Sequence, residues 1–208
     1  MHKFAQCRLL KERSKNMTDV KSILLVGVGG QGTILASKIL TQGLIESGYD
    51  VKMSEVHGMS QRSGSVSTQV RFGSNVYSPI IGKGMADILV SFEEMEAARY
   101  AQYLKKNGTA VINTYRIPSM PILTGVKAYP TNSIQLFKER VKTIDLNATK
   151  IAENMGNSKS ANIVLLGALV KAMGLMDIDW KPIIKRNVKP QFEKVNLNAF
   201  EAGIAAVS

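Results

Sequence analysis

Short apolar runs alternate with stretches of helical periodicity along this 208-residue sequence. A short, continuous apolar run such as Ile23-Leu24-Leu25-Val26 is typical of a strand that is buried on both faces of a sheet. Runs that indicate strands occupy residues 23–26, 51–54, 87–91, 109–113, 126–129 and 143–146. Stretches that indicate helices occupy residues 34–46, 93–106, 133–141 and 147–154. This alternation predicts an α/β fold of three layers, a Rossmann-like, mostly parallel sheet with helices on both faces.

One predicted strand has a different pattern from the others. Residues 65–72 alternate between Val, Thr or Phe on one face and polar side chains on the other. Period two predicts a half-exposed strand that is near a sheet edge or antiparallel. A short return strand is expected at residues 76–79, and the dipeptide Asn107-Gly108 is expected to end the helix at residues 93–106.

The C-terminal tail is predicted to be helical. Ile163, Leu166, Val170 and Met173 are spaced to lie on one face of a helix. Gly167 within that helix indicates close packing against a neighbour. Further helices are expected at residues 180–188 and 192–206.

Two glycine-rich loops follow the first two predicted strands. The first is Gly27-Val28-Gly29-Gly30-Gln31-Gly32, and the second extends over residues 55–65. If a right-handed crossover joins the two strands as neighbours, both loops leave the carboxyl edge of the sheet. Open α/β sheets bind ligands at that edge, so we expect the working crevice there.

The first loop matches the G-x-G-x-x-G pattern through Gly27, Gly29 and Gly32. Backbone amides at this turn and the following helix N-terminus are suited to hold a phosphate. An NAD site also needs an acid about 20 residues onward. Glu55 is the nearest candidate, 28 positions after Gly27. The glycines are alternatively explained by a tight turn and close helix packing.

The second loop carries the candidate polar side chains. His57 is the only histidine beyond the first sixteen residues, and it is a candidate general base or a ligand-orienting group. Arg62 is suited to bidentate capture of a carboxylate or phosphate, or alternatively to bracing the loop. Ser60, Gln61 and Ser63 are suited to join either role.

Charge and cysteine content narrow the function classes. The net charge of +11 favours anionic partners, but no nucleic-acid-binding motif is present. Residues 1–16 carry five basic residues and one acid, and removing them leaves 22 basic against 15 acidic residues, a net charge of +7. We expect a disordered basic extension over residues 1–16 and a single domain over residues 17–208.

The only cysteine, Cys7, lies in that extension. The sequence from Met17 onward therefore has no ligands for an iron–sulfur cluster and no disulfide, which fits a cytoplasmic protein. The longest apolar stretch, residues 161–170, is too short to cross a membrane.

Three segments together resemble the gamma-type domain of 2-oxoacid:ferredoxin oxidoreductases. They are the first glycine loop, residues 55–66 from Glu55 to Val66, and residues 196–203 from Asn196 to Gly203. Within the family, the likeness is closest to the beta subunit of indolepyruvate:ferredoxin oxidoreductase. The string from His57 to Arg62 is more specific than the glycine pattern, whereas Ser63 departs from the glycine expected in many relatives.

The resemblance implies a subunit without cofactor of an enzyme that decarboxylates an arylpyruvate, forms an acyl-CoA and reduces ferredoxin. Thiamine diphosphate and iron–sulfur clusters are expected in a large partner subunit, with CoA as co-substrate and no metal in this chain. The candidate catalytic residues are His57 and Arg62. The candidate ligand-binding residues are Gly27, Gly29, Gly30, Gln31, Gly32, Ser60, Gln61 and Arg62. A nucleotide- or NAD-binding protein, a gamma subunit for pyruvate, 2-oxoglutarate or 2-oxoisovalerate, and a non-enzymatic assembly or regulatory subunit remain alternatives.

Overall fold

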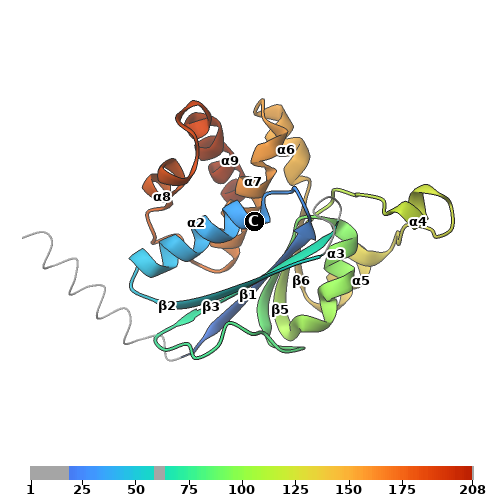
Figure 1. Cartoon of the computed structure of the whole chain (residues 1–208), viewed down its shortest axis with the longest axis horizontal. Coiled ribbons are helices and arrows are strands. Elements are labelled where there is room, and N and C mark those ends of the chain that lie inside the picture. Colours follow the sequence, from blue (N-terminus) through green and yellow to red (C-terminus); the bar gives the residue numbers. More distant parts are fainter. Residues whose placement is uncertain (1–18, 59–63, 208) are drawn as a thin grey trace, which may run out of the picture.

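The computed structural model describes residues 19–58 and 64–207, and their centre is a six-stranded sheet (Figure 1). The strands lie in the order β2-β3-β1-β4-β5-β6. Their bounds are β1 Lys21–Val28, β2 Asp50–His57, β3 Ser65–Gly73, β4 Ala86–Ser91, β5 Leu104–Asn113 and β6 Lys142–Leu146. The pairs β1–β4, β4–β5 and β5–β6 are parallel. Strand β3 is antiparallel to both β1 and β2. All of these strands except β3 therefore point the same way, which confirms the predicted mostly parallel sheet.

The position of β3 corrects the predicted strand order. The first two strands were expected to be neighbours, but β3 lies between them, and its Val70 is opposite Ile23 on one side and Met53 on the other. The prediction was wrong because β3 folds back directly on β2, which closes a much shorter chain segment than a crossover does. Both β1 and β2 are antiparallel to β3, so they still end at the same edge of the sheet, as predicted.

Helices cover both faces of the sheet and confirm the three-layer prediction (Figure 1). One face is covered by α2, α7, α8 and α9, and the other by α3 and α5. The helices are α2 Thr33–Glu46, α3 Glu94–Tyr100, α4 Met120–Leu123, α5 Ser133–Arg140, α6 Ala148–Asn154, α7 Ala161–Ala172, α8 Trp180–Asn187 and α9 Glu193–Ala205. Short 3₁₀ turns are η1 Ala101–Tyr103, η2 Ser158–Ser160 and η3 Pro190–Phe192.

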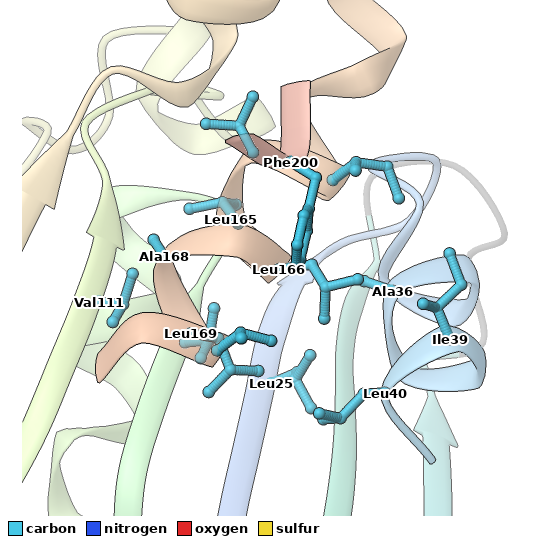
Figure 2. Packing of buried hydrophobic residues seen from close by; sticks show 14 of the residues in the cluster. Leu25, Ala36, Ile39, Leu40, Val111, Leu165, Leu166, Ala168, Leu169 and Phe200 are labelled. Atoms are coloured by element: carbon cyan, nitrogen blue, oxygen red, sulfur yellow. The ribbon is translucent and has the colours of Figure 1, made fainter. Parts of the chain in front are cut away.

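The alternation of side chains along β1 divides the core into two layers. Leu25 belongs to the cluster under α2, α7 and α9, where Figure 2 shows it near Leu40 and Leu169. Leu24 points to the opposite face and belongs to the cluster under α3 and α5. Because β1 is covered on both faces, its continuous apolar run is the pattern expected for a central strand.

Helix α7 is buried on nearly all sides instead of along one stripe. All residues from 162 to 170 are buried, because α7 lies between the sheet and α9. The predicted close approach at Gly167 is confirmed: a Cβ there would collide with the backbone carbonyl of Phe200 on α9. In return, a Cβ on Gly203 of α9 would collide with the backbone carbonyl of Val164.

Three local predictions were wrong. The helix expected over residues 93–106 ends at Tyr100, and Asn107-Gly108 lie inside β5, because Leu104 already packs into the core and Gly108 leaves room for its side chain. Residues 76–79 form no strand, since the Val76 amide donates to the Asp50 side chain instead. Residues 126–129 form no strand either and belong to the projecting segment that contains α4 (Figure 1).

The remaining helices and strands lie within a few residues of their predicted positions, including the helical C-terminal tail. None of the helices in the described ranges is long and apolar enough to span a membrane. The basic extension predicted over residues 1–16 lies outside the described residues.

Candidate functional site

The candidate site lies where the chain leaves the sheet after β1 and after β4. It turns to α2 on one face after β1 and to α3 on the other face after β4 (Figure 1). Open α/β sheets bind ligands at such a switch point, outside the carboxyl ends of the strands. The structure therefore has the predicted crevice, but its second wall is formed at the end of β4.

Two cavities open at this edge, and the glycine turn separates them. The histidine cavity has a volume of about 490 Å³ and is lined by Gly29, Gly30, Gly32, Thr33, Ile34, His57, Gly58 and Val66. The switch-point cavity has a volume of about 550 Å³ and is lined by Gly30, Gln31, Gly32, Phe92, Asn113, Tyr115, Thr149, Glu153, Ser158, Lys159, Ala161 and Leu165. Gly30 and Gly32 line both cavities, so the predicted glycines do lie at the crevice.

The backbone of the glycine turn requires glycine at two positions. Gly30 has φ +98° and Gly32 has φ +77°, in the left-handed region that other residues rarely adopt. Gly29 donates its amide to the carbonyl of Gly64 at 2.9 Å, which ties the turn to the end of the second loop. Helix α2 begins directly afterwards, with no side-chain cap and no acidic residue in its first turn. Its N-terminal amides remain available to an anion.

Gln31 braces the crevice through its side chain. Its carbonyl oxygen Oε1 accepts from the Val28 amide at 2.8 Å, and its Nε2 donates to the Phe92 carbonyl at 2.8 Å. A Cβ on Gly27 would lie only 2.9 Å from Gln31 Oε1, so Gly27 leaves space for this bridge. The amide of Gln31 therefore joins β1 to β4, and Gly27 lies beneath the turn and not at its surface.

Asn113, at the end of β5, was not predicted as part of the site. It is 2% exposed, and its Nδ2 donates to the Phe92 carbonyl at 3.0 Å and to Thr149 Oγ1 at 3.2 Å. Its Oδ1 accepts from the Ala148 amide at 3.0 Å, at the start of α6. Together with Gln31, Asn113 fixes the ends of β1, β4 and β5 around one carbonyl. The sequence signal that could have identified Asn113 was its position as a polar residue at the carboxyl end of an apolar strand. Thr149 and Lys159 had no comparable sequence signal.

The structure places His57 at the end of β2, exposed, beside the glycine turn. Among the described residues, no hydrogen bond of its side chain is found. Glu55, the candidate ribose acid, instead accepts a hydrogen bond from Ser37 of α2 at 3.1 Å. A dinucleotide fold needs that acid on the strand next to β1, and β3 occupies that place. The geometry therefore does not support the NAD alternative.

The other candidates of the second loop, Ser60, Gln61 and Arg62, lie outside the described residues. The structure thus brings His57, Gly29, Gly30 and Gly32 to one cavity, with Gln31 lining the adjacent one. Among residues 19–58 and 64–207, no group of three or more His, Cys, Asp or Glu side chains is placed to hold a metal ion.

Three buried glutamates, Glu93, Glu94 and Glu96, follow β4 and were not predicted as part of the site. Glu93 caps α3 by accepting from the Glu96 amide at 2.9 Å, and it accepts from the Tyr129 hydroxyl at 2.5 Å. Glu94 accepts from Arg116 Nε at 2.7 Å and from the Ser133 hydroxyl at 2.7 Å. These carboxylates therefore tie the projecting segment that contains α4 to α3. Burial, followed by the hydrogen bond to Glu93, raises the pKa of Tyr129.

Glu96 links α3 to the first residue of β3. Its Oε2 lies 2.5 Å from the Ser65 hydroxyl, and its Oε1 lies 3.1 Å from Arg99 Nε. Burial raises the pKa of the Glu96 carboxyl, against the opposing effects of the Ser65 hydrogen bond and the Arg99 charge. Glu96 thus holds the point at which the chain re-enters the sheet after the second loop.

A mixed sheet with an antiparallel strand beside β1, and a glycine turn at the switch point, define a Rossmann-like α/β domain. The chain belongs to the family described as Pyruvate ferredoxin/flavodoxin oxidoreductase, which matches residues 22–206. This family is found in subunits of oxidoreductase complexes, which confirms the resemblance seen in the sequence.

Relatives and solved structures agree with this assignment. The chain is 40% identical over 193 residues to the indolepyruvate oxidoreductase subunit IorB of Thermococcus kodakarensis, covering 89% of this chain and 95% of that protein. The fold is similar to the gamma subunit of a keto/oxoacid ferredoxin oxidoreductase from Geobacter sulfurreducens, with a TM-score of 0.66, 24% identity, and 89% and 97% of the two chains covered. It is also similar to part of a 2-oxoglutarate:ferredoxin oxidoreductase from Magnetococcus marinus, with a TM-score of 0.69, 20% identity, and 91% and 31% covered.

Proposed function

We propose that this chain is the subunit without cofactor of an indolepyruvate:ferredoxin oxidoreductase. The proposed complex converts indolepyruvate and CoA into indoleacetyl-CoA and carbon dioxide and passes two electrons to ferredoxin. The observation that carries the proposal is the 40% identity to an indolepyruvate oxidoreductase subunit over 95% of that protein. Similarity to 2-oxoglutarate and pyruvate synthase subunits is lower, at 32% and 27% identity.

The chemistry is divided between this chain and a larger subunit. Iron–sulfur clusters are held by cysteine thiolates, and this sequence has one cysteine, Cys7, outside its α/β domain. In this proposal the clusters therefore belong to the larger subunit, and the family resemblance implies the same for thiamine diphosphate. The thiamine cofactor supplies the carbanion chemistry of decarboxylation, and this chain contributes binding and positioning.

The contribution of this chain is an anion site at the crevice. In the glycine turn the amides of Gly29 and Gln31 already donate to the carbonyls of Gly64 and Val28, so the uncapped N-terminus of α2 is the part that favours a phosphate or carboxylate. His57 lines the same cavity, and Lys159 adds a cation to the adjacent one. The second loop adds Ser60, Gln61 and Arg62 in the sequence next to His57. We assign this site to the phosphates of CoA or the carboxylate of the 2-oxoacid.

The proposal is tested by assembling the chain with its larger subunit and measuring 2-oxoacid-dependent reduction of ferredoxin or a dye. Aromatic 2-oxoacids are expected to react faster than pyruvate or 2-oxoglutarate, and activity is expected to require CoA. The isolated chain is expected to be inactive and colourless. Equal or faster turnover of pyruvate would contradict the indolepyruvate assignment, and stoichiometric iron in the isolated chain would contradict the division of cofactors.

A further inference from the structure

A groove lies between α3 and α5, at the edge of the sheet opposite the glycine turn. It has a volume of about 780 Å³ and is bounded by α3, η1, the start of β5 and the end of α5. Leu104 and Phe137 form its apolar floor and are almost fully buried. Leu136 stands at its border with 48% of its surface exposed. The groove therefore combines a firm apolar base with a side chain that lacks cover.

The charged residues of this groove all have the same sign. They are Arg99, Lys105, Lys106 and Arg140, and no acidic residue lines it within the described part of the chain. Arg99 and Lys105 are held in place by ion pairs with Glu96 at 3.1 Å and with Asp87 at 2.7 Å. Lys106 and Arg140 form no ion pair with another residue in the described ranges. Their positive charge is thus free to act on a molecule outside this chain.

The polar lining of the groove does not resemble that of a small-molecule site. Such sites carry a few convergent polar groups that orient the ligand. Ser133, the buried polar residue of this lining, already donates its hydroxyl to Glu94 at 2.7 Å. The apolar floor and its cationic surround are better suited to a protein surface that brings an apolar anchor between carboxylates.

We propose that the groove docks an acidic segment with an apolar anchor on the larger subunit of the complex, an inference that rests on the proposed function. A second copy of this chain is a poor occupant, because each copy carries a net charge of +11. The N-terminal segment of the chain is equally unsuited, since residues 1–16 carry five basic residues and one acid. Charge complementarity therefore favours an acidic partner. In the proposed complex, the partner of this chain is the larger subunit.

The test compares two double variants with the same change in net charge. The groove variant, Lys106→Glu with Arg140→Glu, reverses two charges of the groove. The control variant, Lys171→Glu with Lys194→Glu, reverses the charges of two exposed lysines of α7 and α9 outside the groove. Binding to the larger subunit is measured by calorimetry at several salt concentrations. The groove variant is expected to bind about tenfold more weakly, and the control is expected to bind like the wild type. The salt dependence of binding is expected to be smaller for the groove variant.

Leu136→Asp tests the apolar part of the same groove. This side chain is half exposed, so thermal melting is expected to be unchanged while binding is weakened about tenfold. Normal binding by both groove variants, or equal losses in the groove and control variants, would overturn the proposal. The proposal would also be overturned if the groove variant assembled normally with the larger subunit but lost self-association or CoA binding.

Failure of the groove and failure of the proposed function give different results. If the groove variant assembles normally and its complex oxidises indolepyruvate, the proposed function stands and the docking proposal is rejected. If the wild-type complex assembles but does not oxidise indolepyruvate, the proposed function is rejected. The binding of the variants to the larger subunit still tests the docking proposal. A wild-type chain that does not bind the larger subunit rejects both.

Discussion

Arg62 is the residue whose substitution tests the proposed anion site most directly. It follows His57 in the loop that leaves the sheet beside the glycine turn. Arg62→Ala removes a bidentate donor, and Arg62→Lys keeps the charge but loses the planar fork. Both changes are expected to weaken the use of CoA or 2-oxoacid about ten- to a hundredfold, because a charge-assisted hydrogen bond contributes about 1.5–3 kcal/mol. Steady-state kinetics of the assembled complex measures the effect.

The matched control for Arg62 is Lys52→Ala, which removes an exposed cation from β2. This variant is expected to retain wild-type kinetics. Size-exclusion chromatography of the Arg62 variants separates binding from bracing of the loop. A complex that no longer assembles would mean that Arg62 braces the loop, and unchanged kinetics in an intact complex would place the anion site elsewhere.

Glu96 gives a prediction about pH at the residue scale. Burial raises the pKa of its carboxyl above the ordinary value of 4.5, so above that pH the folded protein holds a proton that the unfolded chain has released. The contribution of Glu96 to the free energy of unfolding is therefore present at low pH and is lost as the pH rises through the raised pKa. The side-chain amide of the Glu96→Gln variant does not ionise, so its free energy of unfolding does not show this fall with pH. The melting temperature of the variant relative to wild type is expected to increase from about pH 4 toward neutrality.

Melting curves over that pH range check the prediction, with Glu139→Gln on the exposed side of α5 as control. The control is expected to show no such increase. A difference between Glu96→Gln and wild type that stays constant with pH would show that burial does not govern the ionisation of this carboxyl.

At the scale of elements, the contact between α7 and α9 depends on two glycines. A Cβ on Gly203 would collide with the Val164 carbonyl, and backbone atoms cannot rotate away as a side chain can. Gly203→Ala is thus expected to lower the free energy of unfolding by about 1–3 kcal/mol, although alanine favours an isolated helix. Asn198→Ala, at an exposed position of α9, is the control and is expected to change stability by less than about 0.5 kcal/mol. Denaturant unfolding measures both, and equal stabilities would mean that the helices separate without cost.

The burial of α7 also explains why its pattern was read incompletely. A stripe at residues 163, 166, 170 and 173 is visible in the sequence, but the other residues between positions 163 and 170 are apolar as well. Periodicity alone does not tell an amphipathic helix from one that is covered on all sides. The second layer of helix, α9, supplies the cover that makes every position of α7 from 162 to 170 a core position.

At the scale of the whole molecule, the N-terminal extension is expected to be dispensable. Residues 1–16 are basic and lack the apolar periodicity needed to bury a face against the domain. Deletion of residues 2–16 is expected to change the free energy of unfolding by less than about 0.5 kcal/mol and to leave assembly with the larger subunit intact. Thermal melting and size-exclusion chromatography test this expectation. A large fall in melting temperature would show that the extension packs against the core.

The sequence by itself determined the class of fold and the edge of the sheet that carries the candidate site. Continuous apolar runs define strands that are covered on both faces, and glycines directly after a strand indicate a tight turn. These are local properties of the chain, so the three layers and the position of Gly30 and Gly32 were predictable. The string from His57 to Arg62 likewise indicated the family without any coordinates.

Only the tertiary structure decided the order of the strands and the residues that complete the crevice. Strand order is set by pairing between distant segments, and no local pattern shows that β3 lies between β1 and β2. Asn113 and Gln31 meet at the Phe92 carbonyl from positions far apart in the chain, and Lys159 reaches the same cavity from beyond β6. Periodicity describes which face of an element is buried, whereas long-range packing decides which elements meet there.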